Sequence, residues 1–137
     1  ARLSGSTAEF LHIWSLLVFG PQPFVFNDGL CFVPRPILNG DMFTQEKKEV
    51  NIQLTKNKNI SLKIAENSFA YRLMGQTIAV YHNPKRVNTY GDSKVNVKGF
   101  DLIIKDKTIN IKGNKIKGEY AKKIRNGEVE QLHIYLS

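Results

Sequence analysis

The sequence predicts a mainly β protein: an antiparallel, jelly-roll-like β-sandwich preceded by one α-helix. Apolar residues recur with helical spacing up to Gly20 and at every second position afterwards. The later runs are short, numerous and separated by turn residues, as in sandwiches. A length of 137 residues is enough for one real core. We therefore expect a loop and helix over 1–20, a connector over 21–28 and the sandwich over 29–137.

The helix is predicted to run from about Thr7 to Phe19. It begins with a capping box, in which Ser6 and Glu9 can satisfy each other's backbone N–H groups. Its apolar side chains cover almost the whole circumference: Phe10, Leu11, Ile13, Trp14, Leu16, Leu17, Val18 and Phe19. Such a helix is normally buried on every side, whereas one sandwich can cover a single side. We therefore expect the chain to be the end of a larger, helix-rich protein.

Alternating apolar positions predict the strands of the sandwich in chain order. The turn-rich stretch TKNKN separates the first two runs, and Asn126-Gly127 closes one short helical stretch within 118–128. The apolar positions of the runs are Val50, Ile52 and Leu54; Ile60, Leu62 and Ile64; Phe69, Tyr71 and Leu73; Ile78 and Val80; Val95 and Val97; 102–104; Ile109 and Ile111; and Leu132, Ile134 and Leu136.

The positive charge of the chain is concentrated in its later part. Residues 45–137 hold eighteen of the twenty Lys and Arg residues and nine of the twelve Asp and Glu residues. The lysines are scattered singly and often alternate with apolar residues, which is typical of the solvated face of a sheet. We therefore expect no nucleic-acid partner. No apolar stretch reaches the length of a membrane span, and we expect no membrane association.

The remaining polar residues give little indication of chemistry. The three histidines are far apart in the sequence, and no Cys or carboxylate shows ligand spacing to them, so no metal site and no cofactor are expected. Lys85 and Arg86 follow an Asn-Pro turn and are interpreted as surface residues. Asp28, Asp41 and Asp101 have no predictable partner for acid–base chemistry. Strand tyrosines could form a sugar-stacking platform, although core positions are the commoner use: Tyr71, Tyr81, Tyr90 and Tyr135.

The loop before the helix is the best candidate binding site. Ser4, Gly5, Ser6 and Thr7 combine three hydroxyl groups, a glycine and a helix N-terminus. Free backbone N–H groups and the positive end of the helix dipole can bind an anion there. An ordinary helix cap is the simpler interpretation, because short loops of hydroxyl residues and glycine are common.

The stretches ARLSGSTAEFLHIW, GLCFVPRPIL and VYHNPKR together resemble the C-terminal end of inverting glycoside phosphorylases. The similarity is to the cellobiose- and chitobiose-phosphorylase type, and within it most to the 1,2-β-oligoglucan phosphorylases. Its specific part covers residues 1–38 and 80–91. Glu9 departs from relatives that have an aromatic residue there, which argues against the cellobiose branch. In this family an (α/α)6 barrel ends in a helix introduced by a hydroxyl-rich loop, and a short β-sandwich closes the chain.

The resemblance implies a function for the parent protein. Inorganic phosphate would cleave a β-glucosidic bond with inversion, giving a sugar 1-phosphate from a β-glucan oligosaccharide. Ser4 and Gly5, with Ser6 and Thr7 beside them, would hold the phosphate. The catalytic acid would lie in an earlier barrel loop, so this chain has no catalytic residue and should be inactive alone. A cytoplasmic location and a homodimer that covers the bare helix faces are further expectations.

A second class of function stays open at this stage. The chain could be a non-catalytic β-sandwich that binds carbohydrate or a protein partner, with its helix as the docking element. Several hundred upstream residues with a paired-helix pattern would favour the phosphorylase, and a chain that begins near Ala1 would favour the binding module.

Overall fold

The computed structural model describes residues 13–54 and 58–137. Residues 13–19 are helical, and the rest of the described chain is mainly strand. The elements that follow the helix are β1 (Phe24–Phe26), β2 (Leu30–Phe32), η1 (Gly40–Met42), β3 (Lys48–Leu54), β4 (Lys58–Ile64), β5 (Ser68–Leu73), β6 (Thr77–His82), β7 (Val97–Ile104), β8 (Lys107–Lys112), β9 (Ile116–Lys117), α2 (Glu119–Arg125) and β10 (Gln131–Leu136). The prediction of a mainly β chain with a helix at its beginning is confirmed.

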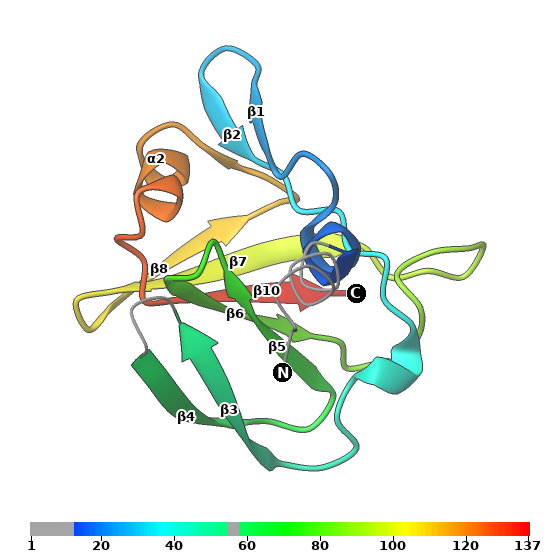
Figure 1. Cartoon of the computed structure of the whole chain (residues 1–137). Coiled ribbons are helices and arrows are strands. Elements are labelled where there is room, and N and C mark those ends of the chain that lie inside the picture. Colours follow the sequence, from blue (N-terminus) through cyan, green and yellow to red (C-terminus); the bar gives the residue numbers. More distant parts are fainter. Residues whose placement is uncertain (1–12, 55–57) are drawn as a thin grey trace, which may run out of the picture.

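A five-stranded sheet of order β5-β6-β10-β7-β8 forms the centre of the molecule (Figure 1). Its neighbours pair antiparallel except β10 and β6, which run parallel. The expectation of purely antiparallel pairing is therefore wrong at this one place. Strands β6 and β7 point in opposite directions, and β10 is inserted between them. A strand inserted between two antiparallel strands must run parallel to one of them.

The β3–β4 hairpin packs on one face of this sheet (Figure 1). Its register places Ile52 opposite Ile60 and Val50 opposite Leu62, so the apolar side chains share one side. Leu54 and Ile64 of the hairpin, together with Ile78 and Val80 of β6, form a small core of their own. The two strands were predicted from their alternation, and they pair as expected.

The main core lies on the opposite face of the sheet. The helical residues 13–19, α2 and the small sheet β1-β2-β9 cover this face. Aromatic rings link these layers: the Phe32 and Phe100 ring centroids are 6.4 Å apart, and those of Trp14 and Phe69 are 6.3 Å apart. The largest fully buried side chains include Phe19, Phe32, Phe43, Tyr81 and Phe100.

Four strands differ from the sequence prediction: β1, β2 and β9 were not among the predicted runs, and β7 joins parts of two of them. β1 lies within 21–28, the segment expected to be a connector, and pairs with β2 through a turn in which Asp28 and Gly29 have positive φ. Strands of three residues are too short to show a period of two. Val97 and the run 102–104, expected in separate strands, belong to the single strand β7.

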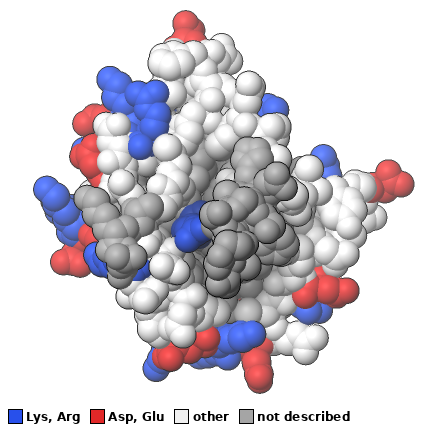
Figure 2. All heavy atoms as spheres, in the orientation of Figure 1, with Lys and Arg blue, Asp and Glu red and all other residues white. Residues whose placement is uncertain are grey.

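Charged side chains alternate in sign around the visible face of the molecule. Figure 2 shows Lys and Arg side chains at the left and lower edges with Asp and Glu side chains between them. This distribution fits the interpretation of the lysines as a solvated surface. Among the described residues, no helix is both long and apolar enough to cross a membrane.

Candidate functional site

The predicted phosphate-binding residues Ser4, Gly5, Ser6 and Thr7 lie outside the described residues, as does His12. The structure does describe the C-terminal end of the helix that would follow this loop. Gly20 ends it with φ of 89° and donates its N–H to the Leu16 carbonyl at 2.9 Å. Pro21 has no N–H with which to continue the helix.

The last carbonyls of the helix are capped by the segment around the PRPIL stretch. The Ile37 N–H donates to the Leu17 carbonyl at 2.7 Å, and the Arg35 N–H donates to the Phe19 carbonyl at 3.0 Å. Carbonyl groups in the last turn of a helix have no partner within it and need one from elsewhere. The segment 33–41, called the strap below, therefore lies along the end of the helix and supplies hydrogen-bond donors to its last carbonyl groups.

Tyr81 of β6 caps the remaining carbonyl from the sheet. Its hydroxyl donates to the Val18 carbonyl at 2.6 Å, and its ring centroid lies 6.3 Å from that of Phe19. The side chain is fully buried, and burial raises the pKa of this hydroxyl well above its ordinary value. It therefore remains a protonated donor. Tyr81 is thus a core residue and not part of a sugar platform.

The strap is also bound to the turn that follows β6. The Leu38 N–H donates to the Thr89 hydroxyl at 2.8 Å, and the Thr89 N–H returns to the Leu38 carbonyl at 3.0 Å. The same hydroxyl donates to the Pro36 carbonyl at 2.8 Å. Residues 16–20, 33–41 and 81–89 therefore form one continuous junction.

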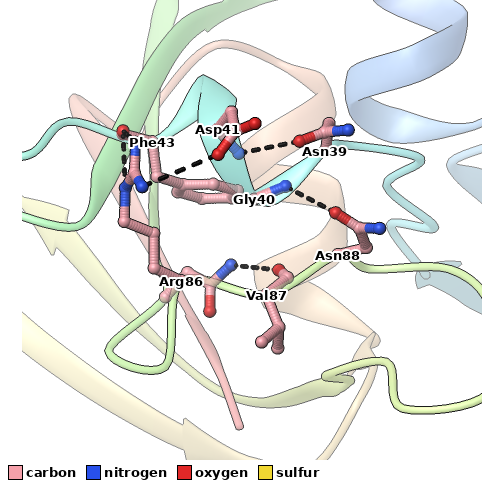
Figure 3. Close-up of polar contacts among 8 residues, drawn as sticks. Asn39, Gly40, Asp41, Phe43, Arg86, Val87 and Asn88 are labelled. Atoms are coloured by element: carbon pink, nitrogen blue, oxygen red, sulfur yellow. Dashed lines mark hydrogen bonds and ion pairs between the residues drawn. The ribbon is translucent and has the colours of Figure 1, made fainter.

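Two asparagines hold the polar end of this junction (Figure 3). Asn88 accepts the Gly40 N–H at 2.8 Å, and Asn39 accepts the Asp41 N–H at 2.8 Å, each through its side-chain oxygen. The oxygen of each carboxamide is thereby turned to the backbone of η1. In Figure 3 both side-chain nitrogens point to the same side, away from Arg86.

Arg86, predicted to be a surface residue, binds two groups of the neighbouring segment. Its φ is 51°, and its guanidinium donates from Nε and Nη2 to the Phe43 carbonyl at 3.3 and 3.2 Å. Its Nη1 lies 3.7 Å from Asp41 Oδ1, in an ion pair between a partly buried guanidinium and an exposed carboxylate (Figure 3). Asn83 is fully buried nearby and donates to the Val87 carbonyl at 2.7 Å, while its Oδ1 has no partner.

A shallow cleft of about 530 Å³ opens between η1 and the segment 86–93. Asn39, Asp41 and Asn88 line it together with Tyr90 and Asp92. Tyr90 is 44% exposed. Its lining thus combines amide, carboxylate and aromatic groups.

A second polar cluster lies on the face of the central sheet beside the β3–β4 hairpin. His82 Nε2 and His133 Nδ1 are 2.8 Å apart, although nothing in the sequence pattern indicated that these residues meet. β10 pairs with β6 through a parallel register that could not be read from the sequence, and this brings the two rings together. The ring centroids are 5.1 Å apart, so the two nitrogens face each other almost in line.

The hydrogen bonds of this cluster define its tautomers. His133 Nε2 lies 3.0 Å from Gln131 Oε1, an acceptor, so Nε2 carries the proton and Nδ1 accepts from His82 Nε2. His82 Nδ1 then faces the Ser68 hydroxyl at 3.3 Å. Both rings are therefore neutral, and each donates one hydrogen bond and accepts another in a continuous series. Ser68 is fully buried and therefore cannot reach a substrate as a nucleophile.

Asp101 on β7 completes the cluster. Tyr135 donates to it at 2.7 Å and Asn110 at 2.9 Å, partners that sequence spacing did not reveal. Burial alone would raise the pKa of Asp101, but these hydrogen bonds and the nearby imidazoles lower it. Burial and the bond to Asp101 raise the pKa of Tyr135 to about 12. The described residues contain no group of three or more His, Cys, Asp or Glu side chains that could hold a metal ion.

The neutral histidine pair predicts acid-sensitive stability. Burial, and then the neighbouring His133, lowers the pKa of His82 from 6.5 to about 4; burial also lowers the pKa of His133, against the opposing charge of Asp101. The unfolded chain binds protons on these histidines near pH 6.5, whereas the folded chain binds them only at lower pH. The contribution of the pair to the free energy of unfolding is therefore fully present above pH 6.5 and is lost as the pH falls toward 4. Because both rings are partly exposed, we expect a loss of roughly 1–2 kcal/mol between pH 7 and pH 5.

Urea unfolding at the two pH values measures this loss. The double variant His82→Gln, His133→Gln should show a much smaller change, and it controls for His12 and all other titrating groups. An equal pH dependence in both proteins would contradict the assignment to this pair.

No protein-family model matches the sequence, and no curated protein matches it closely enough to count as a relative.

Proposed function

We propose that the chain is the C-terminal part of an inverting glycoside phosphorylase that acts on β-glucan oligosaccharides. In this proposal residues 13–19 belong to the last helix of an (α/α)6 barrel, and the sheets form a jelly-roll-like sandwich. The β part holds the C-terminal end of that helix, while residues 4–7 at its other end bind inorganic phosphate. The parent protein would be cytoplasmic.

The capping of the helix end supports the proposal most. The specific part of the family resemblance covers residues 1–38, which include the end of the helix and the PRPIL segment, and residues 80–91, which include Tyr81 and the turn after β6. In the structure these stretches meet, and Ile37, Tyr81 and Arg35 cap the successive carbonyls of Leu17, Val18 and Phe19. A helix fixed so firmly at one end can hold the loop at its other end in a constant position.

The chemistry assigned to this chain is the positioning of phosphate. The Ser4 hydroxyl and the Gly5 backbone N–H would orient one phosphate oxygen toward the anomeric carbon. The new C–O bond forms as the glycosidic C–O bond breaks, and a carboxylic acid outside this chain protonates the leaving oxygen. Without that acid, the chain alone should be inactive.

The exposed side of the helix is consistent with a neighbour that the barrel would supply. Ile13 is 53% exposed and Ile37 on the strap is 51% exposed, while Val18 and Phe19 are buried against the sheets. Further helices of the same protein would cover the exposed side chains. A second copy in a homodimer is the alternative cover.

Phosphorolysis by the protein that contains this chain tests the proposal. With a β-linked glucose oligosaccharide and phosphate, we expect α-glucose 1-phosphate, because inversion of a β-glucoside gives the α-anomer. NMR identifies the anomer, and residues 1–137 alone serve as the inactive control. Release of free glucose at the same rate without phosphate, or formation of the β-anomer, would contradict the proposal.

A further inference from the structure

The cleft between η1 and residues 86–93 plays no part in the proposed phosphate chemistry. We propose that it binds a neutral sugar unit of an oligosaccharide. The inference stands on the cleft alone and goes beyond the proposed function. Its volume of about 530 Å³ lies within the usual range of small-ligand sites.

Two oriented amide donors form one side of the site. The side-chain oxygens of Asn39 and Asn88 are held by the N–H groups of Asp41 and Gly40, both at 2.8 Å. The Nδ2 group of each side chain is therefore the end left to donate to a ligand, and both groups point to the same side (Figure 3). Two donors held in place before binding suit the oxygens of a pyranose, since little freedom is lost on binding.

Tyr90 supplies the apolar contact that a sugar needs. Its ring lines the same cleft and is 44% exposed. The C–H face of a pyranose is apolar, and an exposed aromatic ring can cover it while the hydroxyl groups reach the polar side chains.

The charges of the cleft favour a neutral ligand over an anion. Asp41 and Asp92 both line it, and the one cation among its described lining residues, Arg86, is paired with Asp41 at 3.7 Å. A phosphate or sulfate would meet two carboxylates with no free positive charge. A hydroxyl group can instead donate to a carboxylate and accept from an asparagine.

Nitrogen-15 NMR of the whole chain tests the site with cellobiose, laminaribiose, sophorose and maltose as probes. We expect saturable shifts of the Asn39 and Asn88 side-chain amide signals with at least one of these sugars. Tyr90→Ala should weaken binding about ten-fold, whereas Tyr90→Phe keeps the ring and should bind within two-fold of the wild type.

The double variant Asn39→Asp, Asn88→Asp keeps both oxygens that accept from η1 but removes both donors. It should remain folded, as its urea midpoint will show, and bind about ten-fold more weakly. Absence of saturable shifts with all four sugars, binding that survives both the Tyr90→Ala and the asparagine variants, or a preference for inorganic phosphate at these amides would each overturn the inference. Inorganic phosphate is titrated separately and is absent from the sugar titrations, so failure of the proposed phosphorolysis would leave the sugar result unchanged.

Discussion

Gly40→Ala should destabilise the chain by about 2–4 kcal/mol, because η1 has no room for a side chain at this position. A Cβ atom on Gly40 would lie 2.4 Å from the Arg86 carbonyl oxygen and 3.1 Å from the Val87 carbonyl carbon. Both are backbone atoms and cannot rotate away. The strap and the turn after β6 would have to separate, which breaks the bond from Gly40 to Asn88.

Gly99→Ala is the matched control, since the position lies in the middle of β7. A Cβ atom there would meet only the Ile111 carbonyl oxygen at 3.4 Å, an ordinary contact. Its effect should stay within about 0.5 kcal/mol. Urea unfolding followed by Trp14 fluorescence compares the two variants. Equal midpoints for Gly40→Ala and the wild type would show that the junction is not closely packed.

The elements predicted best are the strands whose side chains alternate between a solvent-facing and a core-facing side. β3, β4 and β10 show this pattern, and each lies where its apolar positions placed it. The short helix α2, closed by Asn126-Gly127, is also confirmed. β1 was missed because its three residues are all apolar and show no alternation. The Asp28-Gly29 pair that joins it to β2 was an available hairpin signal and was not used.

The order of the strands in the sheet could not be predicted from the sequence pattern. Periodicity shows that His133 and Tyr135 lie on the side of β10 opposite the buried Leu132 and Ile134, yet it cannot show which strands are neighbours. The meeting of His82, His133 and Asp101 depends on the insertion of β10 between β6 and β7.

The junction of residues 16–20, 33–41 and 81–89 could not be predicted from the sequence pattern either. Tyr81 and the PRPIL stretch were recognised as parts of a resemblance, but their common role in capping one helix end appears only in three dimensions. The cleft with Asn39, Asn88 and Tyr90 was missed, because its lining comes from two segments almost fifty residues apart. The Asn-Pro turn was the available signal, and it led to a surface assignment for Arg86.

Ser4→Ala should weaken the use of phosphate by roughly ten- to a hundred-fold in the protein that contains this chain. In the proposed function, the substitution would remove one hydroxyl hydrogen bond to a charged ligand, and such a bond contributes roughly 1.5–3 kcal/mol. Sugar affinity should change much less. Gly5→Val should be more harmful, because a branched side chain would prevent the backbone N–H from approaching the phosphate.

In the proposed function, residues 4–7 bind phosphate at the start of the helix. The phosphorolysis rate as a function of phosphate concentration tests it most directly, with wild type and Ser4→Ala measured at saturating oligosaccharide. We expect the phosphate concentration for half-maximal rate to rise roughly ten- to a hundred-fold in the variant. An unchanged phosphate dependence would contradict the claim and leave residues 4–7 as an ordinary helix cap.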